Sequence, residues 1–360
     1  MGTNFDAIKL AVEGATGGKN TVLFDDLGNP SIMVRIPKFK ICDVITGGSD
    51  SVHPAFIVNG VEVNEIFISK YQNFIKDGRA YSLPMQDPQA YVDFDTARKA
   101  CESKGKGWHL MTNAEWAAIA LWCKKNGYFP RGNNSFGKDH AYPHEHGVET
   151  YNYNGQTGRV GTGSGPTTWA HDGTNSGIYD LNGNVWEWCG GLRLVDGEIQ
   201  VIADNNAADG ADMSTSSTLW KAISKTGALV APGSANTLKL DYTTAPGTSG
   251  AKGVAKLVTT LSNKQTVEDP YSAGEFENMT VDSNITVPEI MKALALYPSG
   301  DKDNHGDYLY MRNMGERLPF RGGSFDAAPS RCGVFALSLD RLRTYSGNSI
   351  GFRSAFIEIQ

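Results

Sequence analysis

Residues 177–188 read GIYDLNGNVWEW, a stretch whose second half is a strong strand motif. Successive side chains of a β-strand point to opposite faces of the sheet. Trp186 and Trp188 therefore share one face, which we expect to pack in the core, while Val185 and Glu187 share the other.

Two more patterned blocks lie on either side of this stretch. The first reads GWHLMTNAEW over 107–116, where Thr112 and Glu115 have the spacing of a helix capping box. An apolar stripe of period three and four follows, so we expect a helix that packs on a core. The second block reads RGGSF over 321–325 and closes with IGFR over 350–353.

Together and in this order, the three blocks resemble the formylglycine-generating enzymes, or sulfatase-modifying factors. The resemblance spans about residues 60–360 and implies an α+β, C-type lectin-like fold that is rich in loops and poor in helices. The composition agrees, because the 41 glycines are about 11% of the chain against an average of roughly 7%.

The chain divides into two parts on this reading. Residues 1–60 are expected to be a β-rich N-terminal lead-in, and residues 61–360 the lectin-like domain. Asn59-Gly60 lies between two apolar runs and predicts a hairpin at this boundary. Within the domain, residues of about 192–314 form a long polar insertion, and about 321–353 a variable C-terminal segment.

The last block separates an enzymatic branch of the family from a binding branch. The oxidases that the sequence resembles hold copper with two cysteines five residues apart, and soft thiolates suit Cu(I). Cys332 stands at the second of these positions, but Ala327 stands at the first. A copper-dependent oxidase is therefore disfavoured, and the sequence predicts a protein that is not an enzyme.

The binding branch comprises the variable proteins of diversity-generating retroelements, such as phage tropism determinants. The motifs GVFALSL at 333–339 and IGFR at 350–353 resemble the variable region of these proteins. The resemblance implies a ligand-binding protein with a hypervariable C-terminal surface, used for phage or cell-surface adhesion. A lectin-like binding module without diversification is a further alternative, beside the oxidase.

The predicted ligand-binding surface consists of side chains in the C-terminal segment that do not belong to the patterned core positions of these motifs. Phe335, Leu337 and Leu339 alternate toward the core, and residues 341–349 form a loop of Arg, Tyr, Ser and Gly, a composition typical of binding loops. The predicted ligand-binding residues, expected to be exposed and contiguous, are Phe325, Asp326, Ala327, Ser330, Arg331, Ser338, Asp340, Arg341, Arg343 and Tyr345.

A candidate structural calcium site follows from the same resemblance, since the enzymatic branch builds one at this motif. The matching positions here are Asp180, Gly183, Val185 and Glu187. Two carboxylates with main-chain oxygens suit Ca²⁺. The alternative is a carboxylate held by hydrogen bonds, and no cofactor is required in either case.

The composition limits the kinds of partner that the protein is expected to bind. The formal charge is −6 and the cations are scattered, which excludes a nucleic-acid footprint. No apolar run reaches the ~18 residues of a membrane span, so no membrane insertion is expected. The five cysteines include no CxxC motif, and the first residues lack the pattern of a signal peptide.

The expected partner is a variable protein or glycan ligand on a cell surface. The expected location is a virion (a phage tail) or the prokaryotic cytoplasm before assembly, and a homo-oligomer is compatible with the sequence.

Overall fold

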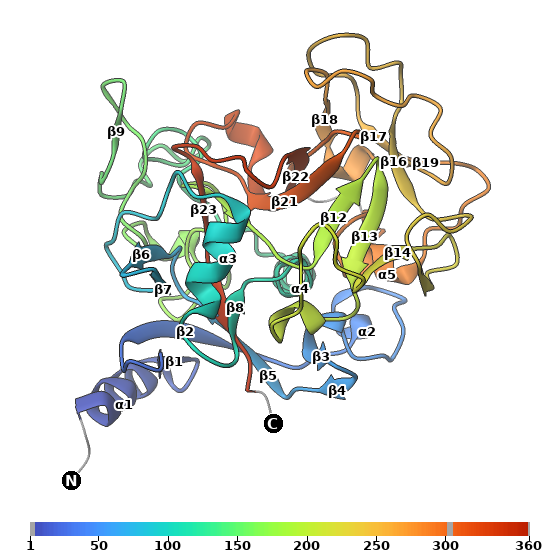
Figure 1. The fold of residues 1–360 in the computed structure, drawn as a ribbon. Helices are drawn as coiled ribbons and strands as arrows, with labels where there is room; N and C mark the ends of the chain where they lie inside the picture. Colours follow the sequence, from blue (N-terminus) through green and yellow to red (C-terminus); the bar gives the residue numbers. More distant parts are fainter. Residues whose placement is uncertain (1–3, 301–304, 359–360) are drawn as a thin grey trace.

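A five-stranded sheet joins the beginning of the chain to its end (Figure 1). The computed structural model describes residues 4–300 and 305–358. In spatial order the sheet consists of β1 (Asn20–Phe24), β2 (Pro30–Pro37), β5 (Glu65–Ser69), β24 (Ser354–Phe356) and β8 (Trp108–Leu110). The N-terminal strands β1 and β2 are therefore part of the same sheet as the C-terminal strand β24.

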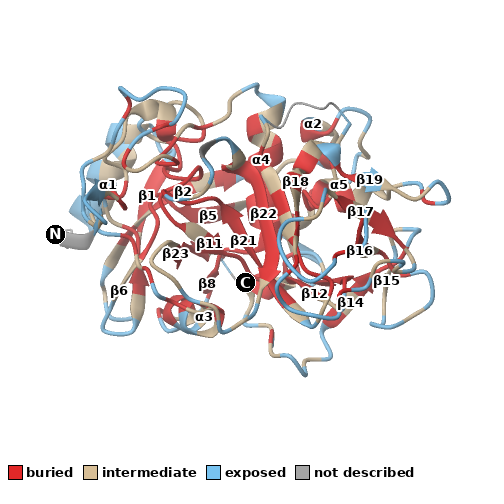
Figure 2. Ribbon diagram, turned by 90° about the horizontal axis from the view of Figure 1, so that it is seen from above, coloured by how far each residue is buried: buried red, intermediate tan, exposed pale blue. Residues whose placement is uncertain are grey.

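A second and larger sheet contains 13 strands of the described chain. Its main path runs through β18 (Ser272–Glu275), β20 (Tyr308–Met311), β22 (Gly333–Arg341), β21 (Glu316–Gly322), β12 (Leu192–Val195), β13 (Glu198–Ile202), β16 (Lys239–Tyr242), β17 (Ala255–Val258) and β19 (Thr280–Val281). Four strands branch from it: β11 (Trp186–Trp188), β14 (Trp220–Ile223), β15 (Leu229–Val230) and β23 (Ile350–Phe352). Figure 2 shows β21 and β22 buried at the centre of the molecule, with the exposed loops around its periphery.

Short elements complete the β-structure. Three two-stranded ribbons are formed by β3 (Ile57–Val58) with β4 (Val61–Glu62), β6 (Phe74–Lys76) with β7 (Arg79–Tyr81), and β9 (Asn152–Tyr153) with β10 (Gln156–Thr157). The 3₁₀ turns are η1 (Pro54–Phe56), η2 (Thr167–Trp169), η3 (Asn206–Ala208), η4 (Phe276–Asn278) and η5 (Pro329–Arg331). The predicted Asn59-Gly60 hairpin is confirmed: both residues have positive φ, 51° and 76°, as a tight two-residue turn requires.

The helices of the described chain are α1 (Asn4–Thr16), α2 (Ile41–Val44), α3 (Phe94–Glu102), α4 (Asn113–Lys125) and α5 (Glu289–Ala293). The capping box predicted before α4 is present, with Thr112 accepting from the N–H of Glu115 and Glu115 accepting from that of Thr112. Nearly all of α4 is buried, and the indole N–H of Trp116 donates to Val334 O of β22 at 2.8 Å. The helix thus fastens the larger sheet to the core.

Helix α1 is a correction to the expected β-rich lead-in. Residues 4–16 are helical, and most side chains from residue 6 onward are exposed or half-buried. Ala, Leu, Lys and Glu have high intrinsic helix propensity, which acts where little packing opposes it. The strands that follow it, β1 and β2, pair antiparallel, as expected of a β-rich segment.

The insertion packs on the same core as the rest of the chain. One cluster of buried apolar side chains extends from Val34 of β2 through Ile119 of α4 to Leu240 of β16 and Leu257 of β17. The insertion begins with an antiparallel hairpin formed by β12 and β13. Because β12 also pairs with β21, the insertion extends the sheet that carries the C-terminal segment.

Candidate ligand-binding site

Strand β22 forms the floor of the candidate site. Phe335, Leu337 and Leu339 point into the apolar core, as the alternation predicts. Ser338 and Asp340 lie on the opposite face and line a pocket of about 430 Å³.

Neighbouring strands add aromatic side chains to this face. Tyr310 of β20 lies opposite Ser338 on one side, and Phe320 of β21 lies opposite it on the other. Strand β11 continues the sheet, where Trp188 pairs with Phe320 and Trp186 lies nearer the pocket. Side chains at paired positions of adjacent strands point the same way. The register therefore concentrates rings on one surface.

Five rings line the pocket, which we call the aromatic pocket: Trp186, Tyr271, Tyr310, Phe320 and Tyr345. Each ring contacts the next. The centroids are 6.4 Å apart for Tyr271 and Tyr310, 6.1 Å for Tyr310 and Trp186, 6.3 Å for Trp186 and Phe320, and 6.1 Å for Phe320 and Tyr345. Burial raises the pKa of Tyr310 to about 12, so its hydroxyl stays protonated at neutral pH.

Charged groups sit at the edge of these rings. Asp340 forms an ion pair with Arg312 at 2.8 Å and accepts a hydrogen bond from Ser338. Arg341 lies 3.3 Å from Asp340 and places its guanidinium 4.5 Å from the centre of the Tyr345 ring. Asp326 is exposed and accepts from Ser324 at 2.8 Å. The pocket thus combines an apolar wall with both signs of charge.

Six of the ten residues predicted to bind ligand line this pocket: Asp326, Ala327, Ser338, Asp340, Arg341 and Tyr345. The structure brings them together from two segments of the chain. Their role in binding remains a prediction.

The expectation that all ten side chains are exposed is wrong. Ser338 and Asp340 are buried in the pocket floor. Phe325 is fully buried, and its ring contacts those of Phe136, Tyr151 and Tyr153 at 6.1, 6.3 and 5.6 Å. These partners come from a distant segment of the chain around β9, which gives Phe325 an apolar environment that its own neighbours in sequence do not reveal.

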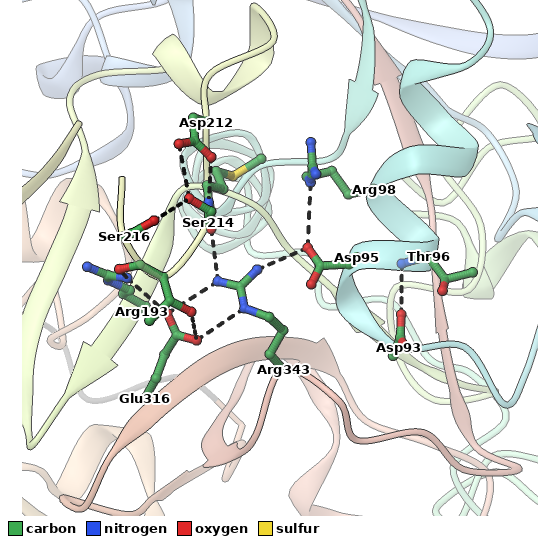
Figure 3. A network of polar contacts seen from close by, with 12 residues as sticks. Asp93, Asp95, Thr96, Arg98, Arg193, Asp212, Ser214, Ser216, Glu316 and Arg343 are labelled. Carbon is green, nitrogen blue, oxygen red and sulfur yellow. Dashed lines mark hydrogen bonds and ion pairs between the residues drawn. The ribbon is translucent and has the colours of Figure 1, made fainter. Parts of the chain in front are cut away.

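Arg343 also departs from the expectation, because it lies within a network of polar contacts (Figure 3). Its guanidinium bonds to Glu316 of β21 and to Asp95 of α3, both at 3.1 Å, and to Met213 O at 2.8 Å. Glu316 is held in turn by Arg193 at 2.9 Å. Arg343 therefore ties α3 to the larger sheet, and its role in binding remains a prediction.

The last two of the ten lie beside the pocket. Ser330 is exposed, and Arg331 places its guanidinium 4.5 Å from the centre of the Tyr308 ring. Neither is among the residues that line the pocket. In contrast, sequence reasoning missed Tyr271 and Tyr310 of the insertion, for which no local pattern gives a signal. It also missed Trp186 and Phe320, whose place in strands suggested only core packing.

The four candidate calcium ligands do converge, but on a side-chain amide. The Nε2 of Gln72 lies 3.1, 3.3, 3.1 and 2.9 Å from Asp180 O, Gly183 O, Val185 O and Glu187 Oε1, respectively. The charge of Glu187 is balanced by Arg353, at 2.6 and 2.7 Å. This N–H₂ group stands at the centre of the four oxygens, beside a neutralised carboxylate. We therefore predict that hydrogen bonds hold these oxygens, in place of a calcium ion.

We expect Gln72→Leu to destabilise the protein by about 2–4 kcal/mol, because buried carbonyls lose their donor. Gln156→Leu, at an exposed position of β10, serves as the matched control and should change stability by no more than about 0.5 kcal/mol. Thermal unfolding of the wild type should be the same with and without EDTA. A chelator-induced fall in the wild-type Tm would contradict this assignment.

The copper site of the family's oxidases is also poorly matched. Ala327 supplies no thiol, and Cys332 is buried, which raises the pKa of its thiol to about 12. Within 4–300 and 305–358 no group of three or more His, Cys, Asp or Glu side chains is placed to hold a metal. One protonated thiol cannot form the two-thiolate site that Cu(I) needs.

The family follows from a comparison with known domains. Residues 12–216 match the model described as "Sulfatase-modifying factor enzyme 1-like domain". The match covers more than half of the chain, so the protein belongs to this family. Its fold is the C-type lectin-like α+β fold of that family, as the three sequence blocks predict.

Two solved structures are similar over nearly their whole length. PvdO from Pseudomonas aeruginosa is 15% identical, with 93% of this chain and 97% of that chain covered, at a TM-score of 0.36. Treponema denticola variable protein 1 is 12% identical, with 94% and 98% covered, at a TM-score of 0.32. No match was found among curated proteins. No helix in the described part of the chain is long and apolar enough to cross a membrane.

Proposed function

We propose that the chain is a non-catalytic binding protein whose ligand enters the aromatic pocket. The observation that supports this most is the composition of that pocket: polar side chains of the C-terminal segment surround five contiguous rings. Ala327, the residue that stands where the oxidases have a cysteine, is part of its lining. The position that supplies a copper ligand in the oxidases therefore lines the proposed ligand-binding pocket in this protein.

The shape and composition suit recognition of a protruding group. A second pocket of about 510 Å³ shares Asp340, Arg341 and Tyr345 with the aromatic pocket, so the two adjoin. Tyr, Trp and Arg are enriched among the residues that dominate binding energy at interfaces. The partner under this proposal is a protein loop or a glycan on a cell surface, and the protein acts as an adhesion module of a phage tail.

We further propose that a retroelement diversifies the C-terminal segment. Four of its pocket positions, Asp326, Ala327, Arg341 and Tyr345, are at least partly exposed, so their replacement creates no large cavity. The test is genomic: a template repeat beside a reverse transcriptase gene should match codons 325–349 and differ mainly at adenines. If the locus contains no such repeat, the proposal of diversification is wrong and only the proposed binding function stands.

A library randomised at these four positions should stay folded and yield binders. We would display it on phage and select against hen egg-white lysozyme as an arbitrary protein target. A control library at Lys76, Asp77, Thr96 and Lys99, all exposed outside the pocket, should yield binders far less often. Equal yields from the two libraries would count against the aromatic pocket as the binding site.

The protein should not convert a sulfatase-type cysteine peptide to formylglycine, even with copper and oxygen supplied. The reason is the missing thiol at Ala327. A peptide mass assay would show turnover directly, and turnover by the wild type would overturn the non-catalytic assignment.

A further inference from the structure

A larger pocket lies away from the proposed ligand site, between β2, α2 and α4. It encloses about 750 Å³, within the range of small-molecule sites, and shares no lining residue with the aromatic pocket. We call it the α4–β2 pocket. Figure 1 shows two of its bordering elements, β2 and α2, in the lower half of the ribbon, whereas β21 and β22 lie in the upper half.

The floor of the α4–β2 pocket is apolar. Val34 and Ile36 of β2 and Ile119 of α4 are buried beneath it, and Phe39 and Trp122 are half-buried at its sides. A concave apolar floor with an open aromatic side favours the non-polar part of a ligand.

The carboxylates that line this pocket already have partners. Glu65 pairs with Arg35 at 2.8 Å, and Asp43 accepts from the backbone N–H of Lys40 at 2.8 Å. Asp172 accepts from the backbone N–H of Thr174 at 2.9 Å. The charge of Glu65 is therefore neutralised within the protein, and the other two carboxylates are held by local hydrogen bonds.

Two lysine ammonium groups of the lining have no partner within the described chain. Lys19 and Lys125 line the pocket and are exposed, and their side-chain ammonium groups have no hydrogen bond or ion pair with any described residue. Lys125 lies one helical turn after Trp122, so both project from the same side of α4.

His171 adds a buried donor. It is only 6% exposed, and its Nδ1 accepts from the backbone N–H of Ile178 at 2.8 Å. The ring proton of the neutral form must then reside on Nε2, which has no partner among the described residues. Burial lowers the pKa of His171 to about 4, to which the charge of nearby Lys19 contributes, so the ring is neutral at pH 7. Its centroid is 5.2 Å from that of Trp122.

We propose that the α4–β2 pocket binds a small apolar carboxylic acid. The hydrocarbon part lies on the floor of Val34, Ile36 and Ile119, against Trp122. The carboxylate is held by the ammonium groups of Lys19 and Lys125 and by the Nε2–H of His171. This site is independent of the function proposed above, because its residues are not those of the aromatic pocket.

Isothermal titration with decanoate tests the proposal on the full chain. We expect saturable one-to-one binding, with decanol, the uncharged analogue, bound at least tenfold more weakly. Lys19→Gln and Lys125→Gln should weaken decanoate binding, by about tenfold in at least one of them, since a tenfold change corresponds to the loss of one charge-assisted contact of about 1.4 kcal/mol.

Two control variants test whether decanoate binds in the α4–β2 pocket. Lys99→Gln removes an exposed charge from α3, and Asp326→Asn alters the aromatic pocket; both should bind decanoate like the wild type. Thermal unfolding verifies that each variant is folded. Absence of saturable binding, equal affinity for decanol, or unchanged affinity in both pocket-lysine variants would overturn the proposal.

Discussion

Arg353→Leu should destabilise the protein by about 3–5 kcal/mol, as expected when one partner of a buried ion pair is removed. Arg353 is fully buried, and two of its nitrogens bond to Glu187 at 2.6 and 2.7 Å. Its remaining bonds reach Ser69 O at 2.9 Å and Tyr179 O at 3.0 Å. The substitution leaves a buried carboxylate without a counter-charge and two carbonyls without a donor.

Chemical denaturation measures this effect, and two further variants interpret it. Arg341→Leu removes an arginine whose side chain is 41% exposed, so it should change stability by no more than about 1 kcal/mol. The double variant Glu187→Leu/Arg353→Leu should recover much of the loss, because the charge of Glu187 is removed together with that of Arg353. If Arg353→Leu has the same free energy of unfolding as the wild type, the ion pair between Arg353 and Glu187 does not stabilise the fold.

Trp188→Ala should also cost about 3–5 kcal/mol, whereas Trp186→Ala should cost only about 1–2 kcal/mol. Trp188 is fully buried, its ring centroid lies 4.0 Å from that of Phe320, and its indole N–H donates to Val92 O at 3.0 Å. Trp186 is half-buried because its outer side faces the aromatic pocket.

Binding should show the reverse order among folded variants. Trp186→Ala, introduced into any lysozyme binder selected from the pocket library, should weaken its affinity at least tenfold, since a truncated aromatic contact at an interface is often a hot spot. Surface plasmon resonance gives the affinity and a denaturant melt gives the stability. An equal loss of stability in both tryptophan variants would mean that Trp186 is a core residue.

The sequence predicts best what short-range patterns determine. Thr112 and Glu115 mark the start of α4, and the alternation of Phe335, Leu337 and Leu339 orients β22, because each signal depends only on neighbours in the chain. The same alternation placed Trp186 and Trp188 on one face, which is correct. It could not show that one of the two lies at the edge of a pocket.

The remainder of the site depends on pairing between distant segments. Tyr310 reaches the pocket because β20 pairs in parallel with β22, and Tyr271 lies one residue before β18, which pairs with β20. Neither register can be derived from the insertion's polar sequence. Arg343 was misplaced for the same reason: its partners Asp95 and Glu316 lie far from it along the chain.

The five-stranded sheet has a practical consequence for presentation. β24 lies in the same sheet as β1 and β2, and Figure 1 shows these strands on the side of the molecule away from β21 and β22. A carrier protein or a sensor surface linked through either end would therefore leave the aromatic pocket facing outward. The order of the strands thus separates the terminal segments of the described chain from the strands that carry the aromatic pocket.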